Sequence, residues 1–471
     1  MFSVARLPKI AKSFCIVLSS RLFLRWSPFG GLLLFKYIWD LLEIPLILQR
    51  VGLGKLRGTP AHVLAFTLLA GFWTRQPSIA SVVRLWHADP LLQWMTFSGF
   101  SVSESNLSRF MNQSDSCWYR FYDEVVAKFQ ALPDRGLVSG TVIVVDDTKI
   151  LHPHAKKNPL LHHSKEDEEW VWGKNTVTSL VIPPDDREYI GAFRYWEKGG
   201  PSKLKLAEDM LTHLAKSASA KDIWVTFDSW YFTYPLCSKI EDLGLNWVSR
   251  AKNSQVFYIP YTGPKRPGCG RQKQWEKLKV SQVVESLQIP PNASTGWYHD
   301  FGTVYIARRV DGKIRRFPTR LIFVLVRKEE GSDEKTVLAL VSNHLEKPAD
   351  FIVQVYQKRW RTEVFYRHAK QDLSLGKCHS PKKEASIAHT ALCLTADLLL
   401  RYAANPDRGL SFSAETPSGA WMDCIIRRPC YWDRRTLRKP KVFFQASQDP
   451  SIDLRISTMI PSSQKLNLWA S

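Results

Sequence analysis

TVIVVDD, residues 141–147, is a run of β-branched residues that ends in two adjacent acids. A short apolar run of this kind is typical of a strand buried on both faces of a sheet. DIWVTFD, residues 222–228, repeats the pattern and ends in Asp228. Neighbouring strands can place such acids close together, so the two stretches predict an α/β core with paired carboxylates.

Strand-like and helical segments alternate around these two runs. Their order predicts a mixed sheet with helices, over a catalytic domain of residues 136–380. The predicted strands are TSLVIP (178–183), EYIGAFRYW (188–196) and NWVSRAK (246–252), and the predicted helices cover residues 204–216 and 230–244.

Three further regions differ in composition from this core. Residues 1–135 are predicted to be a helical domain, because apolar residues recur at helical spacing from Thr59 to about Leu132. Residues 254–340 are turn-rich and basic, with a hairpin signal at Asp311–Gly312, and predict a β-rich insertion. Residues 381–471 are predicted to be helical and basic.

One short helix of the N-terminal region carries Arg109 and is a candidate DNA contact of the helix-turn-helix kind. Ser105 and Asn106 are its candidate capping residues. A helix that packs in the core and exposes one arginine is the favoured interpretation.

The chain is strongly basic. Its 65 Lys and Arg residues outnumber 44 Asp and Glu residues, giving a net charge of +21 and a pI near 9.6, which favours a polyanionic partner. Charged residues and prolines interrupt the apolar stretch from Ser13 to Leu53, so it predicts neither a membrane-spanning helix nor a signal peptide. We therefore expect a cytoplasmic protein that binds nucleic acid rather than a membrane.

Other candidate metal ligands are weaker. The eight cysteines include no C-x-x-C pair and are expected to be reduced. His152, His154, His162 and His163 lack a fixed ligand spacing, so the favoured interpretation is a polar loop with surface histidines.

YQKRWRTEVFYRHAK, residues 356–370, carries the sharpest signal, within a helix predicted from about Pro348 to Asp372. At about 100° per residue, four of its polar side chains fall within roughly 60° of one another. They are Tyr356, Arg359, Glu363 and Lys370. A solvated charged face is the alternative interpretation, but two strand aspartates and a helical glutamate are what two divalent cations require.

These residues resemble the DDE transposases of bacterial insertion sequences, specifically the group with the Y-(2)-R-(3)-E-(6)-K signature. The four helix residues fit that spacing without a gap. DDT at residues 146–148 resembles the first-aspartate motif, in which the catalytic Asp directly precedes Thr, and this favours Asp147. FDSWYF resembles the second motif and gives Asp228, while WVSRAK resembles the next strand and gives Arg250. The resemblance spans about residues 137–380.

The resemblance implies a ribonuclease H-like core and an all-β insertion between the second Asp and the Glu. It also implies a homodimer that pairs two transposon ends. Asp147, Asp228 and Glu363 would be catalytic and bind two Mg²⁺ ions, or Mn²⁺ as a substitute. The reaction would be strand cleavage and strand transfer at the terminal inverted repeats, that is, cut-and-paste transposition. Arg250, Tyr356, Arg359 and Lys370 would contact DNA, and Trp297 of the insertion is a candidate for stabilising a displaced base.

Two questions stay open at this point. Asp146 and Asp147 are adjacent, so on a strand they point to opposite faces and only one can meet Asp228; Asp147 is favoured. A non-catalytic DNA-binding relic is the main alternative function, and the intact acid triad argues against it. A nuclease of the same fold that never rejoins ends is the second alternative.

Overall fold

The computed structural model describes residues 24–54, 58–96, 100–132, 135–152, 157–166, 169–218, 222–264, 272–310, 312–327, 334–403, 418–427, 430–433 and 441–442. The chain divides into two compact units. The helical unit comprises Met1–Phe121, His368–Cys378 and Glu384–Ser471, and the sheet unit comprises Tyr122–Arg367 and His379–Lys383. No helix within the described residues is long and apolar enough to cross a membrane.

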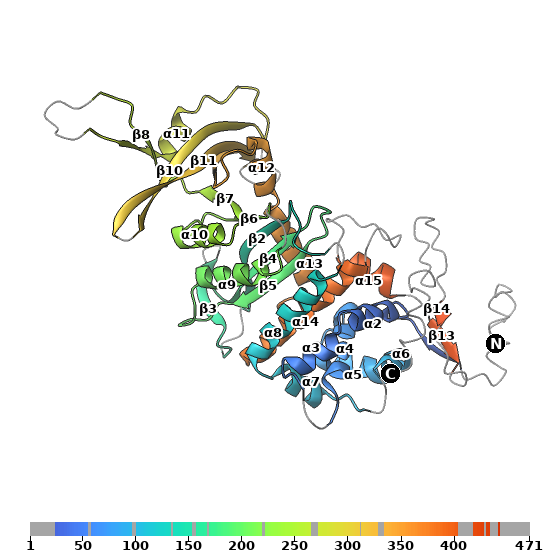
Figure 1. The fold of residues 1–471 in the computed structure, drawn as a ribbon. Coiled ribbons are helices and arrows are strands. Elements are labelled where there is room, and N and C mark those ends of the chain that lie inside the picture. The colour runs from blue at the N-terminus through green and yellow to red at the C-terminus, as the bar shows by residue number, and fades with distance from the viewer. Residues whose placement is uncertain are drawn as a thin grey trace. The chain divides into compact units, whose positions relative to one another are not determined.

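The helical unit is built mainly from short helices (Figure 1). They are α2 (Leu32–Leu41), α3 (Ile44–Arg50), α4 (Ala61–Trp73), α5 (Ile79–Ala88), α6 (Pro90–Met95), α7 (Glu104–Met111), α14 (Lys383–Ala403), α15 (Ser418–Ile426) and the first part of α8 (Asp115–Gln130). A small antiparallel sheet joins β1 (Leu24–Ser27), β13 (Cys430–Asp433) and β14 (Lys441–Val442) in that order.

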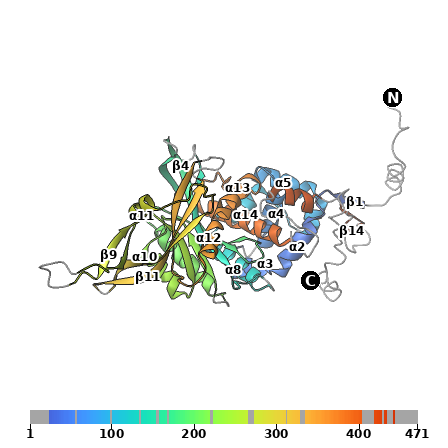
Figure 2. The same cartoon turned by 90° about the horizontal axis from the view of Figure 1, so that it is seen from above.

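Helix α14 is buried along nearly its whole length, because its residues are apolar or small on every side. Figure 2 shows it among α2, α4 and α5. The indole N–H of Trp73 on α4 donates to the carbonyl of Ala396 at 3.1 Å. The N-terminal and C-terminal helical regions, which the sequence treats as separate segments, therefore share one core.

Helix boundaries in this unit follow capping side chains. Ser103, rather than Ser105 or Asn106, caps α7 by accepting from the backbone N–H of Asn106. The helical pattern from Ser81 to Met95 forms two helices, because Asp89 caps α6 and Pro90 has no N–H with which to continue α5. The apolar stretch from Ser13 to Leu53 contains helices α2 and α3, whereas residues 1–23 lie outside the described part of the chain.

The sheet unit is a mixed α/β structure with one large sheet. Its strands are β2 (Val142–Leu151), β3 (Leu161–Glu166), β4 (Glu169–Ile182), β5 (Tyr189–Tyr195), β6 (Trp224–Phe227), β7 (Asn246–Ala251), β8 (Val256–Pro260), β9 (Trp275–Lys279), β10 (Tyr298–Val310), β11 (Lys313–Arg327) and β12 (Lys335–Ser342). Its helices are α9 (Lys203–Ala215), α10 (Tyr234–Asp242), α11 (Val280–Ser286), α12 (Ala349–Gln357) and most of α13 (Trp360–Gln371).

The strand order is β3-β4-β2-β6-β7-β12-β11-β10-β8-β9, and β5 also pairs with β4. The central strands β2, β6 and β7 are parallel to one another, whereas the other described pairs are antiparallel. Strand β12 pairs with β7, so the strands of the predicted insertion continue the same sheet. The predicted hairpin is present, with Val310 opposite Lys313 and Gly312 at φ 73°; Asp311 lies outside the described residues.

Helices cover both faces of the central strands. On one face, the hydroxyl of Tyr366 on α13 bonds that of Thr178 on β4, and Phe351 just beyond the start of α12 packs against Trp224. On the other face, α9 meets β2 through an ion pair between Lys203 and Asp147. We call these the α13 face and the α9 face. Because side chains alternate along a strand, every second residue of β2 belongs to the α13 face.

The strand predictions need two corrections. Strand β2 continues to Leu151, so Asp146 and Asp147 lie inside the strand and not at its end, whereas Asp228 directly follows β6 as predicted. Strand β3 carries His162 and His163, which were expected in a polar loop. The β3 sequence LHHSKE has little apolar alternation, and pairing with the long strand β4 sets its conformation.

Aromatic and arginine side chains hold the outer strands together. The Arg316 guanidinium lies over the rings of Tyr258 and Trp275 at 4.9 and 4.7 Å. Each such contact stabilises by about 0.5–2 kcal/mol, depending on its exposure to solvent. Trp275 therefore has a packing role between β8, β9 and β11.

Candidate active site

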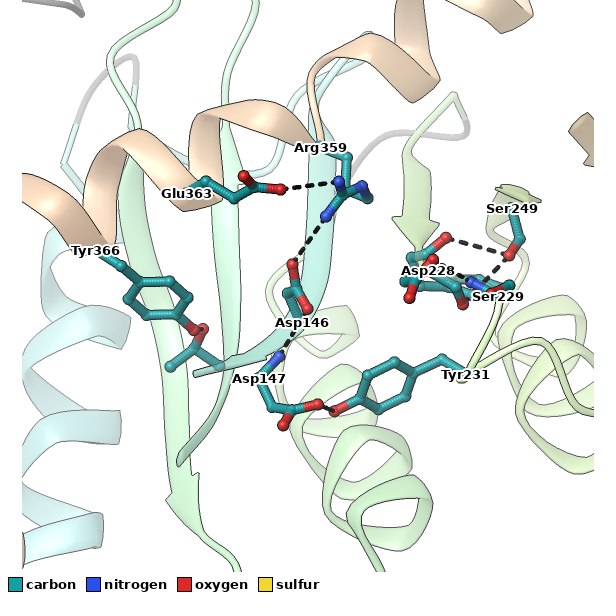
Figure 3. A network of polar contacts seen from close by, with 11 residues as sticks. Asp146, Asp147, Asp228, Ser229, Tyr231, Ser249, Arg359, Glu363 and Tyr366 are labelled. Atoms are coloured by element: carbon teal, nitrogen blue, oxygen red, sulfur yellow. Dashed lines mark hydrogen bonds and ion pairs between the residues drawn. The ribbon is translucent and has the colours of Figure 1, made fainter. Parts of the chain in front are cut away.

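Three carboxylates come from β2, the end of β6 and the first turn of α13. Val145 of β2 pairs with Phe227 of β6 in parallel register. The residues that follow them, Asp146 and Asp228, therefore occupy neighbouring positions on adjacent strands, about 5 Å apart in the hydrogen-bonding direction. Glu363 reaches the same region from α13 (Figure 3).

Arg359 links the helix carboxylate to the strand carboxylate. One guanidinium nitrogen, Nη1, lies 3.1 Å from Oδ2 of Asp146, and Nη2 lies 2.9 Å from Oε1 of Glu363. These are charge-assisted bonds, which are stronger than neutral ones. Figure 3 shows the resulting chain from Glu363 through Arg359 to Asp146.

Asp146 lies in an unusual electrostatic environment. Burial raises the pKa of its carboxyl group to about 6, and the nearby charges of Asp147 and Asp228 act in the same direction. The Arg359 cation and a hydrogen bond from the backbone N–H of Asp147 oppose this rise in pKa. A carboxylate crowded by others in a buried position is one that a cation stabilises strongly.

The carboxylate of Asp147 has different partners, on the α9 face. Its Oδ1 accepts a hydrogen bond from the Tyr231 hydroxyl at 3.0 Å, and its Oδ2 lies 2.5 Å from the Lys203 ammonium. Burial, and then the Asp147 charge, raise the pKa of Tyr231 far above its ordinary value. Asp146, and not Asp147, is therefore the aspartate that Arg359 joins to Glu363.

Sequence reasoning missed the two partners of Asp147. Tyr231 belongs to the FDSWYF motif, three residues after Asp228, and this position in the motif could have marked it as a candidate site residue. Lys203 stands at the start of α9, where no motif marks it, and its ammonium also lies 5.5 Å from the ring centre of the exposed Trp230.

Tyr356 and Arg250 lie beside the same carboxylates. Burial raises the pKa of the Tyr356 hydroxyl; the Arg359 and Arg250 cations lower it, and the Asp228 anion raises it further. Arg250 is exposed on β7, next to Ser249, whose hydroxyl bonds the carbonyl of Phe227. The structure thus brings Asp228, Arg250, Tyr356 and Arg359 together.

The prediction of one continuous helix through these residues is wrong. Helix α12 ends at Gln357 and α13 begins at Trp360. The backbone N–H of Arg359 bonds the carbonyl of Tyr356, and that of Thr362 bonds the carbonyl of Arg359, so these bonds span three residues rather than four. This tightened turn separates Tyr356 from the helix of Glu363, and the common face calculated for a regular helix does not extend across it.

Helix α13 is anchored to the sheet unit by ionic contacts. The Arg361 guanidinium bonds the carboxylate of Glu188, which is 2% exposed, and also Asp186, in the turn before β5. Lys370 stands in the last turn of α13, where the helix belongs to the helical unit. Trp360, which opens α13, is 45% exposed.

The donor chemistry of the site fits magnesium, because hard divalent cations prefer carboxylate oxygens. A cation already lies between two of the three carboxylates, in the form of the Arg359 guanidinium. Within the described residues, no three His, Cys, Asp or Glu side chains converge closely enough to form a metal site. The fit therefore rests on the donor types and on the electrostatic crowding at Asp146.

Among the described residues, the histidines that follow the first aspartates are not grouped as metal ligands. His152 is buried, contrary to the surface position expected for it, and His162 bonds the carbonyl of Trp196. His163 stacks against tryptophan rings, and His154 lies outside the described residues.

Trp297 is half-buried and stacks with His299, with centroids 6.4 Å apart.

Comparison with known families decides which family this site belongs to. Residues 139–399, more than half of the chain, match the family described as "Transposase DDE domain". The chain belongs to the DDE transposase family. Its DDE domain includes Asp146, Asp147, Asp228 and Glu363, and the protein is one of DNA transposition and recombination.

Comparison with solved structures gives a more distant likeness. A cryo-EM structure of the piggyBac transposase synaptic complex with hairpin DNA is similar at 12% sequence identity and a TM-score of 0.43. The match covers 93% of this chain and 88% of that chain. No curated protein matches the sequence.

Proposed function

We propose that this DDE transposase cuts DNA at the terminal inverted repeats of an insertion sequence and joins the freed ends to target DNA. The observation that carries the proposal is that Asp146 lies next to Asp228 on the sheet and is joined to Glu363 through Arg359, with Arg250 nearby. Carboxylates suit divalent ions, and flanking arginines suit phosphate. Together they are the parts that phosphoryl transfer requires.

Asp146, Asp228 and Glu363 would hold two Mg²⁺ ions, or Mn²⁺ in their place. Bound there, the ions would neutralise charge at the phosphate and lower the pKa of an attacking water or 3′-hydroxyl. Asp147 is the alternative first ligand, as its motif position suggests. In our proposal Asp147 instead orients Tyr231 and Lys203 beneath the strand that carries Asp146.

The flanking side chains would position DNA. Arg359 presents a planar guanidinium that can bind phosphate through two parallel hydrogen bonds. Arg250 is exposed, and the Tyr356 hydroxyl lies near it, so both can meet a phosphate next to Asp228. Lys370, on the last turn of α13, would contact DNA near the cut.

The wider assignment follows from the same residues. We propose a ribonuclease H-like core over residues 136–380, with the β-rich insertion at 254–340, and a homodimer that pairs two element ends. The YREK spacing supports placement in that group of bacterial insertion sequences, and a cytoplasmic location fits this source. Residues 1–135 are proposed to help bind DNA, with the exposed Arg109 as one contact.

The test is incubation of the purified protein with a labelled terminal end, its flank and Mg²⁺, comparing wild type with Glu363→Gln. We expect wild type to cut and join strands in a Mg²⁺-dependent way, and the variant to lose at least about a thousandfold in rate while still binding. Cutting without joining would indicate the nuclease alternative. Binding without metal-dependent cutting by either protein would contradict the proposal and favour a non-catalytic binder.

A further inference from the structure

Three aromatic rings form a row on the hairpin of β3 and β4. The ring of His163 lies 4.8 Å from that of Trp172, at an interplanar angle of 21°, and 5.1 Å from that of Trp170, at 37°. His163 stands directly opposite Trp172 in the strand pairing. We call these three residues the aromatic ladder.

Two of the three ladder residues, His163 and Trp170, are open to solvent, and Trp172 is half-buried. Trp170 is 64% exposed, the highest exposure among the large hydrophobic side chains of the described residues, and His163 is exposed as well. So exposed a tryptophan buries little apolar area and contributes little to folding. A contiguous exposed aromatic surface is the kind that marks a binding site.

The ladder lies on the same face of the sheet as Asp146. Asp146 is opposite Thr178 of β4, whose hydroxyl bonds Tyr366 of α13. Side chains alternate along a strand, so positions 176, 174, 172 and 170 share the face of Thr178. The pairing of β2 with β4 has no register shift over this length, so the alternation is uninterrupted.

The distance from the carboxylates follows from strand geometry. Six residues separate Thr178 from Trp172, which at about 3.3 Å per residue gives roughly 20 Å. Strand β2 ends at Leu151, opposite Gly173, so Trp170 and Trp172 extend beyond it on the hairpin. The intervening Thr178, Thr176 and Lys174 are each 2% exposed, so DNA cannot lie on that part of the face and the ladder is a contact separate from the carboxylates.

The chemistry of the ladder suits unpaired bases. Flat exposed rings offer stacking faces, and each base stacked on an aromatic side chain gains about 1–3 kcal/mol. Bases inside an intact duplex already stack on their neighbours and have no free face to offer. The net charge of +21 attracts the DNA backbone to the protein, and the ladder and the carboxylates belong to the same compact unit.

We propose that the aromatic ladder of His163, Trp170 and Trp172 stacks on unpaired DNA bases at a distance of roughly 20 Å from the phosphate that is cut. The inference rests on the proposed function, because DNA must first bind at the carboxylates. It adds a contact by the β3–β4 hairpin that neither the DDE motif nor the YREK signature includes.

The test uses terminal DNA with 2-aminopurine at successive positions on both sides of the cut, in a paired and in an unpaired segment. We expect wild type to quench fluorescence in the unpaired segment, and Trp170→Ala and Trp172→Ala to lose the quenching. Affinity for the unpaired DNA should fall about tenfold for each variant and change less than about twofold for paired DNA. Trp170→Phe keeps a stacking face and should retain most of the affinity.

The matched control is Phe100→Ala, which removes an exposed ring in the helical unit and should leave both affinities unchanged. Equal losses on paired and unpaired DNA would overturn the proposal, as would wild-type affinity in both tryptophan variants. Unchanged DNA binding with altered sedimentation of Trp170→Ala would instead assign the ladder to contact between copies of the chain. Wild-type cutting that is lost in Glu363→Gln shows separately whether the underlying function holds.

Discussion

Two regions of the α13 face differ in how their side chains are held. The Asp146 side chain is only 17% exposed and is joined through Arg359 to Glu363, whereas Trp170 of the aromatic ladder is mostly exposed and packs against the ring of His163. Around Asp146, charged groups are removed from water, which lowers the stability of the fold unless the charges are paired. At the aromatic ladder, apolar surface stays exposed to water. Each departs from the arrangement that folding alone favours, and both departures suit a DNA substrate.

The largest effect should follow from removing the cation of the first region. Arg359→Ala leaves Asp146 buried beside Asp228 without its counter-charge, and removes a proposed phosphate contact. We expect the single-turnover rate of strand cutting to fall by at least about a hundredfold. Arg359→Lys should recover little of this loss, because an ammonium group cannot form two parallel hydrogen bonds. A rate within threefold of wild type for Arg359→Ala would remove Arg359 from the site.

The next effect concerns how α13 is held on the sheet. Arg361→Ala removes the guanidinium that pairs with the buried Glu188 carboxylate, so the free energy of unfolding should fall by about 3 kcal/mol in urea titrations. Lys205→Ala breaks the exposed pair with Asp209 and should cause no measurable change. Trp170→Ala should also unfold like wild type, because the ring is exposed. Similar losses for all three variants would erase the proposed difference between the two regions.

The smallest effect concerns His62, a partly buried titratable side chain in the helical unit. Burial, and then the Lys36 cation, lower the pKa of His62 below 6.5. The folded protein therefore binds this proton less readily than the unfolded chain, and stability is lost as the pH falls below 6.5. Because solvent screens His62, we expect His62→Gln to flatten the pH dependence of unfolding between pH 7 and 5 by no more than about 0.5 kcal/mol. A steeper dependence in the variant would reverse the sign we assign.

The sequence predicts the central strands well, because their β-branched runs are short, buried and separated by clear helical patterns. It also places Asp228 at the end of β6, and the spacing of Arg359 and Glu363 marks them as candidate site residues. These features depend on local periodicity, which is written in consecutive residues.

Features that depend on tertiary contacts cannot be predicted from the sequence pattern. The choice between Asp146 and Asp147 depends on which helix covers each sheet face, and spacing along the chain does not contain that information. The tightened turn at Arg359 follows from two ion pairs with the sheet, Arg359 with Asp146 and Arg361 with Glu188. These contacts override an otherwise regular helical pattern. Strand β3 exists because β4 offers an edge to pair with.

The central claim is that Asp146, with Asp228 and Glu363, performs the chemistry, and one matched pair of variants tests it most directly. Asp146→Asn and Asp147→Asn change the same atoms on neighbouring residues, and both should still bind end DNA. We predict that Asp146→Asn loses Mg²⁺-dependent strand cutting as completely as Glu363→Gln, at least about a thousandfold, while Asp147→Asn stays within about tenfold of wild type. Full loss in Asp147→Asn with activity preserved in Asp146→Asn would contradict the account and assign the first ligand to Asp147.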